Sequence, residues 1–167
     1  MTDATAELHG RPAALEWSID TCTVQRALKV VGDRWSFVVL REVFLGVRRF
    51  GDMRQRTAIP RQVLTDRLAH LVEQDVLRRE PYRALGQRER HEYRLTAKGF
   101  ALYPILVALN DWGSAYYAEP EGPPLRFEHA DCGADVHARL HCDGGHDVTE
   151  PREVLPAPGP GARRRAG

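Results

Sequence analysis

The sequence predicts a mainly α-helical fold with a small β ribbon, an α+β class, on three observations. Apolar residues recur at helical spacing through much of residues 22–117, as Leu64, Leu68 and Leu71 illustrate. Residues 90–95 instead alternate between polar and apolar side chains, the period of a half-buried strand. The chain is 167 residues long and 43% hydrophobic, which is enough for one packed domain with extensions.

Two helices are expected after a flexible lead of residues 1–20. The first begins near Cys22 and ends at Gly32, because glycine is common just past a helix end. Asp33 then caps a second helix by accepting hydrogen bonds from its free N–H groups, and Gly46 closes that helix.

A pair of short helices joined by a tight turn should follow. Phe50 and Met53 anchor the first of them, and residues 57–59 form the turn. The second opens at Pro60, because proline lacks an N–H group that would have no intrahelical partner at that position.

A two-stranded ribbon comes next in the chain. Residues 76–80 and 90–95 form its strands, and Gly86 marks the turn between them. Two short helices followed by such a ribbon make a winged helix-turn-helix.

Basic residues concentrate in this same stretch. The formal net charge of the whole chain is +1, but thirteen basic residues face seven acidic ones between residues 48 and 98. A local basic surface favours a polyanionic partner. The second helix of a helix-turn-helix enters the DNA major groove, where arginine and glutamine can each bind a base edge. The predicted contacts with double-stranded DNA are Arg54, Arg56, Arg61, Gln62, Thr65, Arg67, Arg83, Arg88 and Arg90.

Thr96 is expected to cap one long helix that runs to about Tyr117. Its apolar stripe is wider than a small winged domain can cover, and it comprises Leu102, Ile105, Leu106, Leu109, Trp112 and Tyr116. A second copy of the chain could cover this stripe, and so in part could the N-terminal helices. We expect a homodimer, the common state of helix-turn-helix proteins on DNA.

Composition divides the chain into five parts. After the lead, residues 21–118 form the winged helix domain, and residues 119–124 read as a linker rich in proline and glutamate. Residues 125–149 form a Cys/His-rich appendage, and residues 150–167 form a Pro/Gly/Arg tail that should be disordered.

The appendage offers four zinc ligands in two pairs. They are His129 with Cys132 and Cys142 with His146, and neighbouring glycines would supply tight turns around them. His137 and His141 compete as ligands. A structural zinc, a Cys132–Cys142 redox pair and a plain hairpin with surface histidines all remain open.

The expected compartment is the cytoplasm. No apolar run approaches the ~20 residues that span a bilayer, so no membrane partner is predicted. The first residues have neither a basic region nor a long apolar region of the kind found in secretion signals.

A series of short motifs resembles the HxlR-type transcriptional regulators, which are winged-helix relatives of the MarR regulators. The motifs lie between Cys22 and about Tyr117, and they comprise Cys22 and residues 31–35, 49–53, 64–68, 92–99 and 111–113. The resemblance implies a homodimer on a pseudo-palindromic operator, with an interface made by the N-terminal helices and the helix of residues 96–117. One departure concerns the wing, where residues 84–90 lack the prolines that many members have.

Several regulators similar to this chain sense electrophiles or oxidants at the position of Cys22. A thiol at a helix N-terminus lies at the positive end of the helix dipole, which favours the reactive thiolate. Arg26 would add to this effect and Asp20 would oppose it. A small buried structural thiol is the alternative.

The leading functional hypothesis is a sequence-specific DNA-binding regulator, acting as a repressor and switched at Cys22 by a quinone, an aldehyde or a peroxide. One alternative is a winged-helix regulator that responds to a non-covalent small ligand. Another is a winged helix that binds a protein. A thiol enzyme using Cys22 is a further class, but the chain has no nucleophile elbow or glycine-rich phosphate loop. We therefore expect no enzyme.

Overall fold

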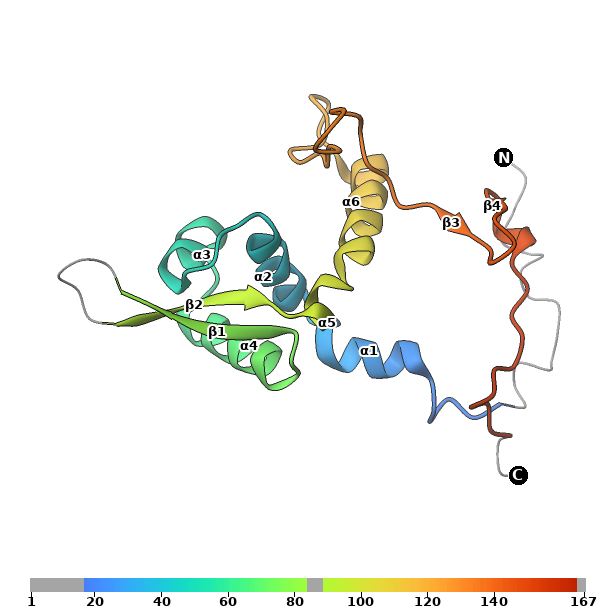
Figure 1. The fold of residues 1–167 in the computed structure, drawn as a ribbon, viewed down its shortest axis with the longest axis horizontal. Helices are drawn as coiled ribbons and strands as arrows, with labels where there is room; N and C mark the ends of the chain where they lie inside the picture. The colour runs from blue at the N-terminus through green and yellow to red at the C-terminus, as the bar shows by residue number, and fades with distance from the viewer. Residues whose placement is uncertain (1–16, 84–88, 165–167) are drawn as a thin grey trace. The chain divides into compact units, whose positions relative to one another are not determined.

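The computed structural model describes residues 17–83 and 89–164 (Figure 1). The chain divides into two compact units. The larger comprises residues 27–138, and the smaller combines the N-terminal segment up to residue 26 with the segment from residue 139 onwards.

The first two helices begin and end where the sequence predicted. Helix α1 (Thr23–Val31) stops before Gly32, where a Cβ atom would lie 2.4 Å from the carbonyl oxygen of Leu28. Asp33 caps helix α2 (Arg34–Phe44) by accepting a hydrogen bond of 2.9 Å from the Trp35 backbone N–H. Gly46, with φ at +83°, takes the left-handed conformation that follows the helix end.

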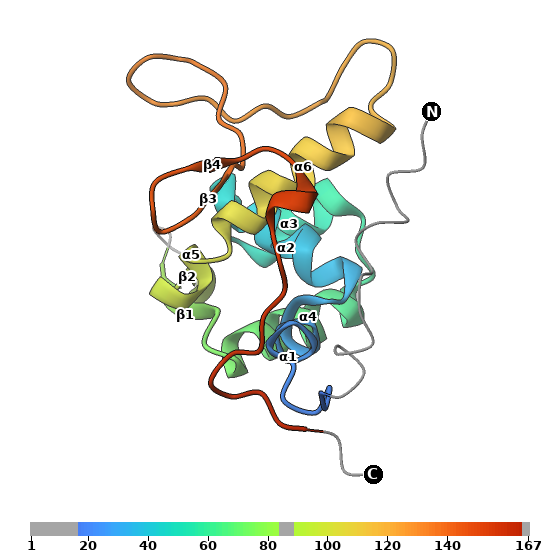
Figure 2. The same ribbon diagram turned by 90° about the vertical axis from the view of Figure 1, so that its right-hand side faces the viewer.

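Helix α2 packs on the helix-turn-helix pair, α3 (Phe50–Thr57) and α4 (Arg61–Glu73), and the three helices gather together in both views (Figures 1 and 2). The turn between α3 and α4 contains Ala58 in the left-handed conformation, with φ at 53°. The core of this unit is built from aliphatic side chains that are almost fully buried, chiefly Val39, Leu40, Met53, Ile59, Leu64, Leu68, Leu71, Val76 and Leu77.

The ribbon consists of β1 (Leu77–Tyr82) and β2 (Arg90–Leu95), which pair antiparallel with Leu77 opposite Leu95. Tyr93 and Leu95 are buried, and the first two residues of β2 are exposed. The segment before α3 adds to the other edge of β2, because the Tyr93 N–H donates to the Arg48 carbonyl at 2.8 Å. This arrangement confirms the predicted mainly helical fold with a β wing. The predicted turn at Gly86 lies outside the described residues.

The prediction of a single helix from Thr96 to Tyr117 is wrong. Thr96 caps a short helix, α5 (Ala97–Phe100), and a separate helix, α6 (Tyr103–Tyr117), follows it. Pro104 explains the interruption, because it has no N–H to donate and its ring crowds the carbonyl one turn earlier.

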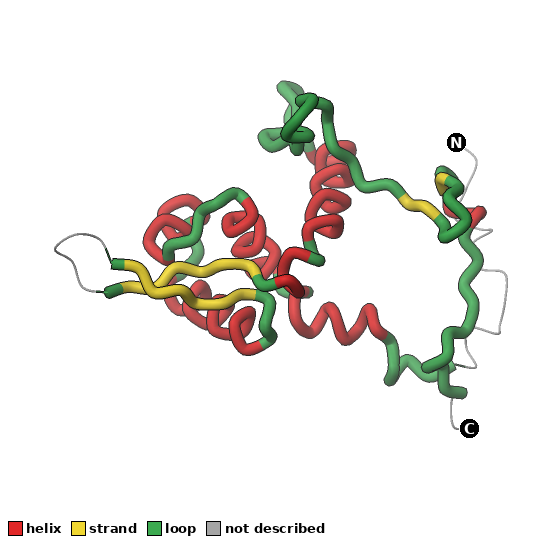
Figure 3. Tube along the Cα trace, in the orientation of Figure 1, coloured by secondary structure: helices red, strands yellow, loops and turns green. Residues whose placement is uncertain are grey.

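Residues beyond α6 are mostly loop (Figure 3). Those up to residue 138 belong to the larger unit, where the Asp111 carboxylate binds His137 Nδ1 at 3.0 Å and the Ala138 N–H at 2.9 Å. The predicted appendage of residues 125–149 is therefore divided between the two units.

The smaller unit holds two short antiparallel strands, β3 (Leu140–His141) and β4 (Asp147–Val148), and a 3₁₀ helix, η2 (Pro151–Glu153). The tail, whose composition predicted disorder, hydrogen-bonds the N-terminal segment where the Ser18 N–H donates to the Arg163 carbonyl at 2.8 Å. Within the described parts of the chain, no helix combines the length and the apolar character needed to cross a membrane.

Candidate nucleic-acid interface

Helix α4 has one buried face and one polar face. Leu64, Leu68 and Leu71 are fully buried, whereas Arg61 and Gln62 in the first turn are exposed. Thr65 is exposed as well, so the three residues predicted to read bases lie on the accessible side of the helix.

Two of these three side chains have partners on their own helix. Gln62 Nε2 donates to Asp66 Oδ1 at 2.8 Å, and Thr65 Oγ1 donates to the Arg61 carbonyl at 2.9 Å. The hydrogen bond between Gln62 and Asp66 must therefore break before Gln62 can make a bidentate contact with adenine.

An open groove of about 600 Å³ lies at the turn between α3 and α4. Two arginines line it, Arg54 from α3 and Arg61 from α4, together with Phe50, Gly51, Gln55, Ala58, Ile59 and Pro60. A cationic groove beside the start of a helix is suited to a phosphate group, because arginine side chains and free backbone N–H groups both bind anions.

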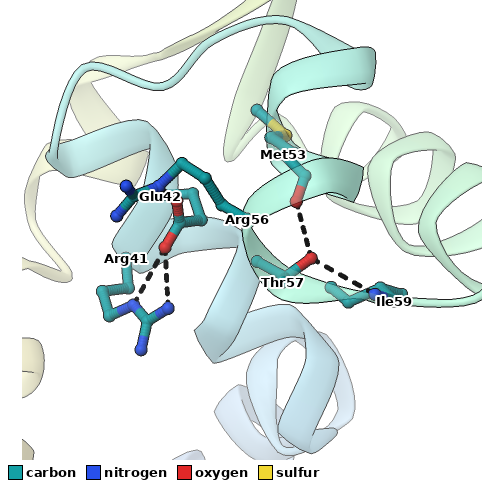
Figure 4. A network of polar contacts seen from close by, with 6 residues as sticks. All are labelled: Arg41, Glu42, Met53, Arg56, Thr57 and Ile59. Carbon is teal, nitrogen blue, oxygen red and sulfur yellow. Dashed lines mark hydrogen bonds and ion pairs between the residues drawn. The ribbon is translucent and has the colours of Figure 1, made fainter.

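Arg56, a further predicted DNA contact, binds a buried carboxylate inside the protein. Its Nε lies 2.6 Å from Oε2 of Glu42, and the Arg41 Nη2 lies 2.7 Å from Oε1 (Figure 4). The Glu42 side chain is completely buried, whereas about half of each arginine side chain is exposed. The network joins α2 to α3, so Arg56 helps to position the helix-turn-helix.

Burial alone would raise the pKa of Glu42, but the hydrogen bonds from Arg56 and Arg41, aided by their charges, outweigh it and hold this pKa below its ordinary value. The sequence alone did not identify Glu42 as the buried partner of two arginines. The available signal was the charged pair Arg41–Glu42 within the otherwise apolar stretch Val38–Phe44.

The wing carries further arginines at the end of β1 and the start of β2. Arg83 and Arg90 are exposed, Arg67 on α4 is half-buried, and Arg88 lies outside the described residues. Arg94 of β2 forms ion pairs of 2.6 Å with both Glu80 and Glu92. Arg94 is therefore engaged within the ribbon by acidic residues that the charge count of residues 48–98 already includes.

Cys22 lies in the smaller unit immediately before α1, and its carbonyl accepts the Arg26 N–H at 3.1 Å. The residue is partly exposed and lines a pocket of about 1200 Å³. Trp17, Arg26 and residues 155–163 of the tail also line this pocket. A small molecule could therefore reach the thiol.

The four predicted zinc ligands form two separate pairs. Cys132 Sγ lies 3.4 Å from His129 Nδ1, and Cys142 Sγ lies 3.4 Å from His146 Nδ1. Backbone hydrogen bonds from His146 and Gly144 lower the pKa of the Cys142 thiol. Among the described residues, no group of three or more candidate ligands forms a complete metal site.

The two competing histidines contact carboxylates instead. His137 Nδ1 lies 3.0 Å from Asp111 Oδ1, and His141 Nδ1 lies 2.6 Å from Asp147 Oδ1.

Comparison with known proteins identifies the domain. The model of the HxlR-like helix-turn-helix family matches residues 30–121. A helix-turn-helix transcriptional regulator of Mycobacterium tuberculosis strain H37Rv is 45% identical over 144 residues, which cover 86% of this chain and 89% of the relative.

Solved structures agree with this assignment. The transcription factor PA1607 has 33% identity and a TM-score of 0.72, over 83% of this chain and 95% of that one. The redox regulator HypR in its oxidised form has 27% identity and a TM-score of 0.50, over 56% of this chain and 96% of that one.

The family match, the relatives and the fold agree with the resemblance noted in the sequence motifs, and they identify a transcriptional regulator and not an enzyme. The chain belongs to the HxlR family of helix-turn-helix regulators.

Proposed function

We propose that this regulator binds a specific operator in double-stranded DNA by placing the first turn of α4 in the major groove. The observation that carries the proposal is the polar face of α4, where Arg61, Gln62 and Thr65 are exposed beside a fully buried leucine stripe. Arginine and glutamine can each recognise a base through two hydrogen bonds.

The residues around α4 serve to fix its position on the duplex. Arg54 lines the same groove as Arg61, which suits it to a phosphate at the edge of the major groove. Arg83 and Arg90 of the wing would contact the backbone or an adjacent minor groove, and Arg88 belongs to the same proposal. Repression follows if the operator overlaps a promoter.

The regulator would act as a homodimer on a pseudo-palindromic site. Helix α6 leaves large apolar side chains exposed, namely Ile105, Leu109, Trp112, Tyr116 and Tyr117, with 45–72% of their surface accessible. An apolar face of this kind on one helix is typical of an interface. Two copies would place their α4 helices about one turn of DNA apart.

Arg61→Ala should weaken binding to the specific operator by about 1–3 kcal/mol, and it should relax the choice of base at one position in each half-site. Fluorescence anisotropy with the operator and with a random duplex would measure both effects. Arg152→Ala, which removes an exposed arginine from η2, serves as the control and should leave both affinities nearly unchanged. Equal losses on the two duplexes would show that Arg61 contacts phosphate only.

We further propose that an electrophile or oxidant switches DNA binding through Cys22. The pocket around this thiol contains an aromatic side chain, Trp17, and a cation, Arg26. That combination suits a small aromatic or anionic electrophile such as a quinone. The similarity to HypR, a redox regulator, supports the same interpretation.

A gel shift with duplex from the upstream region of the regulator's own gene tests the switch. A quinone, an aldehyde or peroxide should release the protein that carries Cys22 from DNA. The Cys22→Ser variant should remain bound under the same treatment. Release of both proteins would instead favour a non-covalent ligand. If none of the three reagents affected DNA binding, Cys22 would have only a structural role in packing.

A further inference from the structure

The wing is attached to the helix-turn-helix by the two residues that precede α3. The Tyr93 N–H of β2 donates to the Arg48 carbonyl at 2.8 Å, and Arg49 forms an antiparallel bridge with Glu92. Arg49 is also the N-cap residue of α3, and its carbonyl accepts the Met53 N–H at 3.0 Å. One residue therefore links β2 to the start of the helix-turn-helix.

The side chain of Arg49 reaches across the ribbon to β1. Its guanidinium carbon lies 4.4 Å from the centre of the Tyr82 ring, within the range of a cation–π contact. The register explains this reach, because Arg49 bridges Glu92, and Glu92 pairs with Glu80. Tyr82 follows Glu80 by two positions, so its side chain lies on the same face of the ribbon. Arg49 is thus held by its backbone at one strand and by its side chain at the other.

Ion pairs hold the rest of this face together. Arg94 lies 2.6 Å from both Glu80 and Glu92, and Arg78 Nη2 lies 2.7 Å from Glu80 Oε1. These ion pairs join residues of the ribbon to one another. The contact between Arg49 and Tyr82 differs, because it joins the ribbon to α3.

Tyr82 lies beside arginines that we propose as DNA contacts of the wing. Arg83 follows it in the chain, and Arg90 is its partner across the ribbon. Cross-strand partners lie within about 5.5 Å of each other and move together. A contact that fixes Tyr82 against the start of α3 therefore also fixes Arg83 and Arg90 relative to the groove at the α3–α4 turn.

We propose that the Arg49–Tyr82 contact holds the wing at the angle at which its arginines meet the DNA backbone. In the free protein this contact raises the fraction of molecules whose wing is already in the binding position, so less free energy is lost to ordering the wing on DNA. Arg49 is in this role a positioning residue. The inference rests on the proposed wing contacts with DNA, and it depends neither on Cys22 nor on the operator sequence.

Fluorescence anisotropy with a random-sequence duplex at low salt tests the proposal, because contacts between basic side chains and phosphates do not depend on base sequence. Arg49→Ala and Tyr82→Leu should each weaken binding about two- to fivefold for each wing on the duplex, the factor that an exposed cation–π contact contributes to an equilibrium constant. Tyr82→Phe keeps an aromatic face and should bind as tightly as the unsubstituted protein. Tyr82 carries no charge, so a loss in Tyr82→Leu reports on the ring and not on a missing cation.

A second protein background shows whether the loss acts through the wing. This background is the triple variant Arg83→Ala, Arg88→Ala and Arg90→Ala. Adding Arg49→Ala to it should have no further effect on affinity, because a displaced wing without its arginines has no contact to lose.

Arg79→Ala is the matched control, because it removes another exposed arginine that lies over a tyrosine ring. The Arg79 guanidinium carbon lies 5.9 Å from the centre of the Tyr93 ring, and both residues belong to the ribbon. Arg79→Ala should therefore change affinity by the same small factor in the unsubstituted protein and in the triple variant. Urea denaturation would verify that every variant remains folded.

The results that would overturn the proposal differ in what they leave standing. If the triple variant bound the duplex as tightly as the unsubstituted protein, the wing contacts would be wrong and the inference would fail with them, whereas the role of α4 would still be tested by Arg61→Ala. If Arg49→Ala weakened the triple variant and the unsubstituted protein by the same factor, Arg49 would contact phosphate itself and the wing contacts would stand. Full affinity in Tyr82→Leu would likewise show that the ring does not position the wing.

Discussion

Replacing Glu42 by alanine is expected to lower the free energy of unfolding by about 3 kcal/mol. The carboxylate is fully buried and accepts three hydrogen bonds, two from Arg41 and one from Arg56. The substitution loses these charged hydrogen bonds and leaves a cavity between α2 and α3. This loss of free energy is at the lower end of the range for breaking a buried ion pair. Both arginine side chains are about half exposed, so water can solvate them once the carboxylate is gone.

Urea denaturation at a fixed protein concentration would measure this loss. Glu73→Ala provides the control, because Glu73 is an exposed carboxylate at the last residue of α4. It should change stability by no more than about 0.5 kcal/mol. If Glu42→Ala matched this control, the buried ion pairs would contribute little to positioning α3.

The same residue predicts a dependence on pH. The folded-state pKa of Glu42 lies below its ordinary value of 4.5, so the ionised side chain stabilises the folded state above that value. This contribution is lost as pH falls through the folded pKa. The difference in stability between the unmodified chain and Glu42→Ala should therefore be constant near neutrality and shrink on acidification below 4.5. A difference that grew on acidification would contradict the assigned direction of the pKa shift.

The helix-turn-helix could be predicted from the sequence because its signals are local. Leu64, Leu68 and Leu71 follow the helical period, and all three are fully buried. Asp33 is a capping residue by type, and the structure shows its carboxylate at that cap. Such patterns depend on neighbours within one or two turns, which the sequence displays directly.

The break between α5 and α6 was also visible in principle. Pro104 stands in the first turn of α6, a position that proline tolerates because the N–H there has no partner. The apolar stripe that runs through Leu102, Ile105 and Leu106 suggested an uninterrupted helix instead. Periodicity reports which face is buried, but it does not report whether the backbone hydrogen bonds continue.

Charge pairing could not be predicted, because it depends on contacts between elements. Arg56 and Glu42 are fourteen positions apart, and only the packing of α3 on α2 brings them to 2.6 Å. A count of arginines therefore overstates the free positive charge, as the ion pairs of Arg94 also show. For the Cys/His residues the sequence offered several partners, and the backbone of each turn shows which cysteine faces which histidine.

Gly99→Ala is expected to destabilise the fold by about 3 kcal/mol, at the upper end for an overpacked site. Gly99 is a buried residue of α5, and a Cβ atom there would lie 2.2 Å from the carbonyl oxygen of Val76 and 3.0 Å from Leu95 Cδ2. The Val76 oxygen belongs to the backbone, so it cannot move aside as a flexible side chain could. It already accepts a hydrogen bond of 3.1 Å from the Thr96 N–H, which ties α5 to the start of the ribbon.

Gly51→Ala is the matched test, because Gly51 lies in helix α3 and a Cβ atom there would meet nothing within 4 Å. Alanine in an open helical position should stabilise the fold by about 0.5–1 kcal/mol. Urea denaturation with unchanged slopes would therefore give opposite signs for two identical chemical changes. The comparison isolates the cost of crowding at Gly99, because both variants gain the same methyl group and lose the same backbone freedom in the unfolded chain. Equal effects of the two substitutions would mean that α5 can shift away from Val76 at little cost, and that Gly99 does not fix the position of the wing.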